Sequence, residues 1–231
     1  MNFDSLVASF FSTQQAVLPT AFAQYLGLYV AWALVLAWGA SALTGRWPSP
    51  IRWGIVGVVG LLTLISGPSS PAYWFGLAFQ TPSVTSVLLA VWGLSIVARS
   101  RSSNGSHGWS VSGLAACAAG AGLGWVLLLD TLAWWPLSVY AWGFSPATVS
   151  GLTLTLAICW GLWGGAHKGR TSHLVFGVPV MALIIFVGTR WPSGNVWDAL
   201  LDPWLWVGLQ IVLLVNVLRA WRQRGSPAIR V

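Results

Sequence analysis

The chain has 231 residues, of which 56% are hydrophobic and only 6% carry a formal charge. A soluble domain usually carries about 25% charged residues, so this composition excludes a soluble enzyme, a secreted disulfide scaffold and a disordered chain. The net charge of +7 comes from basic residues in short loops between apolar runs, not from a stripe that could bind nucleic acid. The sequence therefore predicts an all-α, multi-pass membrane protein in one domain.

The first predicted element is an amphipathic helix within residues 1–19. Phe3, Val7, Phe10 and Phe11 recur at the spacing of one helical face, with Asp4 and several serines between them. We expect this helix to lie in the membrane interface on the outer side, because its apolar face alternates with polar residues.

Seven apolar segments follow within residues 20–221, and each is close to the length that a helix needs to cross a bilayer. In chain order they are Thr20–Leu43, Ile51–Ser66, Pro82–Ala98, Trp109–Leu129, Pro146–Trp163, Leu174–Thr189 and Pro203–Ala220. The second segment is the shortest. It is still predicted to span, because the basic loops around Arg46 and Arg99 share a side only if two crossings separate them. Residues 222–231 are predicted to form a basic cytoplasmic tail.

The charges predict an orientation. Ten of the eleven basic residues fall in loops on one side of the predicted spans, and Arg190 alone falls on the other. All four acidic residues share the side of Arg190: Asp4, Asp130, Asp198 and Asp202. The excess of basic residues in cytoplasmic loops places the N-terminus outside and the C-terminus in the cytoplasm. The expected location is a bacterial inner (plasma) membrane.

A repeat accompanies the predicted spans. Pro19, Pro82, Pro146 and Pro203 lie 57 to 64 residues apart, and each opens a span that runs inward. This period indicates duplicated helical hairpins, or it reflects the preference of proline for the first turn of any helix. Three spans, a linker span and three more would be similar in plan to the SWEET sugar transporters and to the nicotinamide riboside transporters. That likeness is architectural only, because no motif of either family is present.

Four amides lie in or beside the predicted spans: Gln24, Gln80, Gln210 and Asn216. An amide that finds no hydrogen bond in hydrocarbon is costly, so these groups either line a solute path or bond to neighbouring helices. No ionisable residue lies at the centre of a predicted span. That absence disfavours a proton relay and hydrolysis inside the bilayer.

The fourth predicted span is rich in small residues. Gly113, Gly120 and Gly124 recur in it among alanines, which permits a close approach to another helix. We therefore expect this helix to be central or tightly packed against a partner helix.

The outer side combines acids with aromatic rings. Its candidate residues are Asp130, Trp134, Trp135, Trp197, Asp198, Asp202 and Trp204. Three interpretations are open: an aromatic belt at the membrane interface, a surface that docks a membrane protein partner, and a cage for a cationic or flat ligand. Arg190 could also pair with Asp198 or Asp202 and neutralise the cluster.

Two functions are consistent with these patterns. The main hypothesis is a transporter or permease-like protein for a small solute, without proton-relay residues. The alternative is a non-catalytic subunit or assembly partner of a larger membrane complex, docking through its tryptophan-rich outer face. The sequence shows no catalytic constellation and predicts no metal or cofactor. The expected partners are the lipid bilayer and a membrane protein or a second copy, but no nucleic acid.

Overall fold

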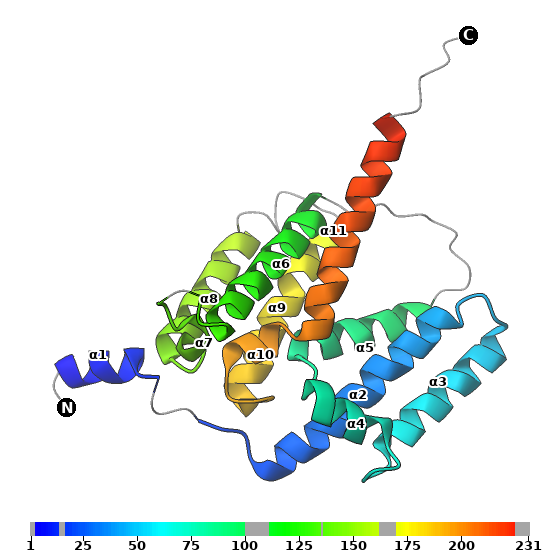
Figure 1. Ribbon diagram of the computed structural model, residues 1–231, viewed down its shortest axis with the longest axis horizontal. Coiled ribbons are helices and arrows are strands. Elements are labelled where there is room, and N and C mark those ends of the chain that lie inside the picture. The colour runs from blue at the N-terminus through cyan, green and yellow to red at the C-terminus, as the bar shows by residue number, and fades with distance from the viewer. Residues whose placement is uncertain (1–2, 14–16, 100–110, 135, 162–169, 225–231) are drawn as a thin grey trace.

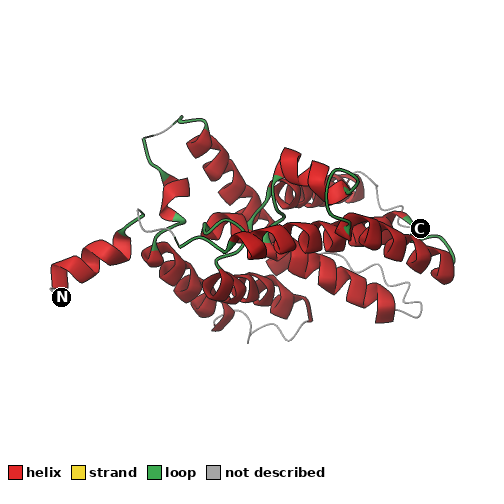
Figure 2. Ribbon diagram, turned by 90° about the horizontal axis from the view of Figure 1, so that it is seen from below, coloured by secondary structure: helices red, strands yellow, loops and turns green. Residues whose placement is uncertain are grey.

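A computed structural model describes residues 3–13, 17–99, 111–134, 136–161 and 170–224, and every regular element in these ranges is a helix (Figures 1 and 2). The prediction of an all-α protein is confirmed for this part of the chain. In order, the helices are α1 (Phe3–Phe11), α2 (Ala21–Leu43), α3 (Ser49–Leu64), α4 (Pro71–Phe79), α5 (Val84–Arg99), α6 (Val111–Thr131), α7 (Val139–Trp142), α8 (Pro146–Cys159), α9 (Arg170–Thr189), α10 (Val196–Leu200) and α11 (Pro203–Arg224).

Each of the seven predicted spans contains a helix, but the helices differ in length. Three of the described helices are long and apolar enough to cross a membrane: Ala21–Leu43, Val111–Thr131 and Pro203–Gln223. The other four are shorter apolar helices, and α3 and α5 have 16 residues each. At 1.5 Å per residue, such a helix is about 24 Å long, whereas the hydrocarbon core is about 30 Å thick. The structure thus supports three candidate spans, and seven spans remain a proposal.

The short helices gather at one end of the bundle. In Figure 1, α4, α7 and α10 lie toward the lower side of the view, and α11 rises away from them toward the C-terminus. We call the end that carries α4, α7 and α10 the predicted outer end. Helix α1 lies at the edge of the bundle in both views. Its helical structure is as predicted, and its place in the membrane interface stays a prediction.

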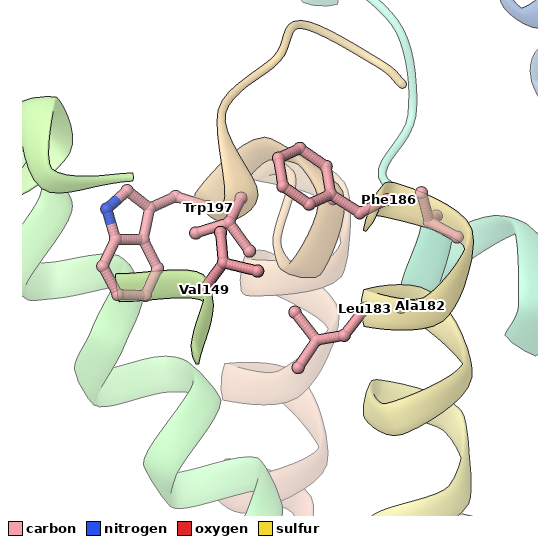
Figure 3. Close-up of a cluster of buried hydrophobic side chains, with 8 residues drawn as sticks. Val149, Ala182, Leu183, Phe186 and Trp197 are labelled. Carbon is pink, nitrogen blue, oxygen red and sulfur yellow. The ribbon is translucent and has the colours of Figure 1, made fainter. Parts of the chain in front are cut away.

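Two apolar cores hold the helices together. The larger core joins α5, α8, α9 and α10, and Figure 3 shows Val149, Phe186 and Trp197 converging within it. The smaller core joins α2 and α4 around Trp32 and Ala72. The larger core thus packs a short helix of the predicted outer end against three of the longer helices.

Polar caps mark the starts of the four helices that were predicted to run inward. Thr20 caps α2, Ser83 caps α5, Ser145 caps α8 and Asp202 caps α11, each by accepting a backbone N–H of the first turn. Each cap adjoins one of the four prolines of the repeat. The spacing of the prolines therefore corresponds to the spacing of helix starts, whether or not the chain arose by duplication.

Candidate functional site

The carboxylate of Asp202 joins two helix starts at the predicted outer end. Its Oδ2 accepts hydrogen bonds from the Ser83 backbone N–H at 2.8 Å, from the Ser83 hydroxyl at 2.7 Å and from the Ser86 hydroxyl. Its Oδ1 accepts the Leu205 N–H at 2.8 Å. Asp202 is only 7% exposed. The positive ends of α5 and α11 both face this carboxylate, which stabilises its charge.

The other two outer acids are joined through Tyr140 of α7. The Tyr140 N–H donates to Asp130 Oδ2 at 2.7 Å, and its hydroxyl donates to Asp198 Oδ2 at 2.8 Å. Ser193 donates a further hydrogen bond to Asp198. Burial, and then the Asp198 charge and its hydrogen bond, raise the pKa of Tyr140 well above its ordinary value. The carboxylates accept donors from the chain itself, and these hydrogen bonds form a scaffold that joins α6, α7 and α10.

Helix α10 is held against α7 by hydrogen bonds from the buried side chains of Asn195 and Trp197. Asn195 Nδ2 donates to the Tyr140 carbonyl at 3.0 Å, and Asn195 Oδ1 accepts the Trp197 N–H at 2.9 Å. Trp197 Nε1 donates to the Val139 carbonyl at 2.9 Å. Trp197 is buried within the larger core. It therefore contributes to the predicted outer end as a buried residue, because its ring fills the space between α7, α8 and α10.

Large apolar side chains remain exposed beside this scaffold. Leu132, Trp134, Leu137 and Trp142 are 52%, 76%, 52% and 46% exposed, and they lie between the end of α6 and the end of α7. We call these four residues the α6–α7 aromatic edge. Trp135, which was predicted to belong to the same face, lies outside the described residues.

Trp204 lies at the start of α11, away from this edge. It packs against the Phe79 ring with a centroid distance of 4.7 Å, and it is 46% exposed. The described rings of the predicted outer face are therefore divided between the segment that joins α6 to α7, helix α10 and helix α11.

The four candidate amides do not converge. Gln24 is exposed in the first turn of α2. Gln80 follows α4 at a φ of 60°, and its carbonyl accepts the Trp32 indole N–H at 2.9 Å. Gln210 and Asn216 are half-buried in α11, and each donates to the carbonyl four residues earlier, at 3.4 and 2.8 Å. These two side-chain amides therefore form hydrogen bonds within α11, whereas one interpretation of the sequence expected hydrogen bonds between helices. A solute path along them stays a prediction.

Two glycines of α6, Gly120 and Gly124, lie against α11. A Cβ on Gly124 would collide with the Trp206 indole, and one on Gly120 would meet Leu209 Cδ1 at 2.6 Å. Trp206 Nε1 also donates to the Ala121 carbonyl at 3.0 Å. Gly113 is buried nearer the start of α6. The close approach at these positions is thus between the α6 backbone and side chains of α11.

Arg190 does not pair with the acids that share its side. In the described part of the chain, no acidic oxygen lies within ion-pair distance of its guanidinium. The group instead lies over the Phe186 ring, 5.4 Å from the centroid. Asp198 and Asp202 accept hydroxyl and amide donors in its place.

Sequence reasoning missed the donors that satisfy the acids. These are Ser83, Ser86, Tyr140 and Ser193, with Asn195 as the buried link. Helix-cap patterns could have found Ser83 and Asn195, because each precedes an apolar helix. A local sequence pattern cannot show that Ser83 and Ser86 contact Asp202, because each lies more than one hundred positions from it.

Comparisons with known proteins add no functional information. No protein-family model matches the chain, and neither a curated protein nor a solved structure matches it.

Proposed function

We propose that the protein is a non-catalytic subunit or assembly partner of a larger membrane protein complex, and that it docks through the α6–α7 aromatic edge. One observation carries this proposal. The acids of the predicted outer end are hydrogen-bonded within the chain, while large apolar side chains at the same end are exposed. Exposed apolar surface rimmed by polar groups is typical of interaction sites, and tryptophan is enriched among the residues that dominate binding.

The scaffold under this edge favours docking because it is already ordered. Asp130 holds the Tyr140 backbone, and Asn195 holds the Tyr140 carbonyl, so α7 is fixed from two sides. Binding then orders few additional groups, which lowers the entropic cost of association. The same tryptophans would also suit a membrane interface, so the test must separate a protein partner from lipid.

The test is native mass spectrometry of the tagged protein extracted from its own host in mild detergent. We expect a stoichiometric second polypeptide with the wild type. We expect its loss when Trp134→Ala and Trp142→Ala are combined. Trp221→Ala is the matched control, because Trp221 is 73% exposed on α11 far from the edge. A complex that survives the double substitution, or a wild type without any second polypeptide, would contradict the proposal.

Transport of a small solute is the second candidate. The half-buried amides of α11 and the seven apolar helices favour it. Replacing Gln210 and Asn216 by Leu should abolish uptake if these amides line a path, and normal uptake by a folded double variant would exclude that role. We further propose that the chain lies in a bacterial inner membrane, with its N-terminus outside.

A further inference from the structure

A groove runs between α8 and α9 at the predicted outer end. It has a volume of about 530 Å³. Its lining includes Pro146, Ser150, Leu154 and Ala157 from α8, with Val187 and Arg190 from the end of α9. The walls are mostly apolar, and Ser150 and Arg190 bring polar groups to it. A groove of this kind suits a ligand with a long apolar part and a polar head.

The charge in this groove is positive, and it has no ion-pair partner among the residues that the structure describes. Arg190 is the one basic residue on the predicted outer side. Its guanidinium forms no ion pair or hydrogen bond with the described residues, and its nearest aromatic partner is the Phe186 ring at 5.4 Å. The three described acids near that end are hydrogen-bonded to Ser83, Tyr140 and their neighbours. A half-buried guanidinium beside apolar walls favours an anion from outside the chain.

The backbone at Arg190 is also unusual. Its φ is 56°, in the left-handed region that favours glycine or asparagine after a helix. An arginine there costs free energy that a glycine would avoid. The conformation directs the chain away from α9 directly after Thr189, the last residue of that helix. If α9 crosses the membrane, Arg190 lies at the depth of the lipid headgroups.

We propose that this groove binds an anionic phospholipid, with the lipid phosphate on the Arg190 guanidinium and one acyl chain between α8 and α9. The planar guanidinium donates two parallel hydrogen bonds to phosphate oxygens. Leu154, Ala157 and Val187 pack against the methylene groups of the chain, and these dispersion contacts hold it in the groove. Free phosphate would use only the guanidinium and leave the groove empty. This site does not include the residues of the α6–α7 aromatic edge, so it stands independently of the proposed docking function.

The test uses the full-length protein, delipidated in detergent and titrated with phosphatidylglycerol in native mass spectrometry. We expect Arg190→Gln to weaken phosphatidylglycerol binding by about tenfold, because it removes charge-assisted hydrogen bonds. Arg219→Gln is the matched control near the end of α11, and it should leave the affinity unchanged. Ala157→Phe fills the groove but keeps the guanidinium, and it should also weaken phosphatidylglycerol binding.

Three results would overturn the proposal. One is Arg190→Gln binding phosphatidylglycerol as tightly as the wild type. A second is an equal loss in Arg219→Gln, which would indicate non-specific attraction. The third is displacement of phosphatidylglycerol by millimolar inorganic phosphate, which would indicate an anion site without a role for the acyl chain. Thermal unfolding without lipid confirms that each variant is folded before its affinity is compared.

Discussion

At the residue scale, the single carboxylate of Asp202 accepts hydrogen bonds from the starts of two helices. One oxygen caps α11 through the Leu205 N–H, and the other receives the Ser83 N–H and hydroxyl at the start of α5. A buried carboxylate without a basic partner is tolerated only when such donors surround it. Asp202 therefore ties α5 to α11 in place of an ion pair.

Asp202→Asn should destabilise the protein strongly. The amide group brings its own N–H donors against the Ser83 and Ser86 donors and removes the negative charge at two helix starts. We expect the free energy of unfolding to fall by about 2–4 kcal/mol, measured by denaturant titration in detergent. Asp4→Asn is the control on the exposed face of α1, with an expected change of about 0.5 kcal/mol or less. Equal effects of the two substitutions would show that Asp202 is not structurally important.

The raised pKa of Tyr140 predicts that the free energy of unfolding depends on pH. Its pKa is raised in the folded state, first by burial and then by Asp198, above the ordinary 10.0. Above pH 10 the unfolded chain releases the phenolic proton, while the folded chain keeps it. The folded state then binds more protons, so the stability due to Tyr140 is present below pH 10 and is lost as the pH rises through the folded pKa. Stability of the wild type should therefore decline between pH 10 and 11, and the decline should be smaller in Tyr140→Phe.

The measurement is the free energy of unfolding at pH 8, 10 and 11. Tyr73→Phe is the matched control, because Tyr73 makes a ring contact with Trp74 and has no carboxylate partner in the described part of the chain. If Tyr140→Phe declines as steeply as the wild type between pH 10 and 11, the phenol is not responsible for the alkaline loss.

At the element scale, two pairs of helices pack with a tryptophan ring of one helix against a glycine of the other. Gly124 of α6 receives Trp206 of α11, and Gly93 of α5 receives Trp38 of α2. The absence of a Cβ lets a large ring lie directly on the neighbouring backbone, where Trp206 also donates a hydrogen bond. Such pairs bury large apolar area at a short interhelical distance, which is the packing that helices need where lipid is as apolar as the side chains.

Gly124→Ala should separate α6 from α11. The added methyl group collides with the Trp206 indole, a rigid ring whose hydrogen bond to the Ala121 carbonyl opposes its displacement. Overpacking of this kind costs about 1–3 kcal/mol. Gly122→Ala is the matched control on the same helix, because nothing lies within 4 Å of its added Cβ; it should be neutral or stabilising by up to about 1 kcal/mol. The measurement is the free energy of unfolding of each variant in detergent. If both variants lose stability equally, the collision at Gly124 is not the reason for the loss.

Helices could be predicted from the sequence because their signal is local. The apolar segment Thr20–Leu43 and the helix Ala21–Leu43 nearly coincide, since a long apolar run bounded by a cap leaves few alternatives. The contacts of the site could not be predicted, because Ser83 and Asp202 lie 119 positions apart. The role of Gln210 was equally hidden, since an amide in a helix can bond to its own backbone or to a neighbour with the same local sequence.

At the scale of the whole molecule, the number of crossings depends on the short helices. Helix α3 runs antiparallel to α2 and is fixed to it near both ends. Arg52 donates to the carbonyl and the hydroxyl of Ser41 at 3.1 and 2.9 Å, and Tyr29 accepts the Gly67 N–H at 3.1 Å. Tyr29 and Ser41 are 12 residues apart on α2, about 18 Å along its axis. If α2 crosses the membrane, we expect a helix bonded to it over that length to cross beside it.

We therefore expect the two ends of α3 to lie on opposite sides of the membrane. In a background with Cys117 and Cys159 replaced by Ala, Ser69→Cys should react with a membrane-impermeant maleimide on spheroplasts. Ser49→Cys should react only after permeabilisation. Both substitutions are conservative, and both positions are exposed. If the two cysteines react on the same side, α3 does not cross. The loop at Arg46 would then share a side with α4, and the basic loops would no longer fall together as the positive-inside rule requires.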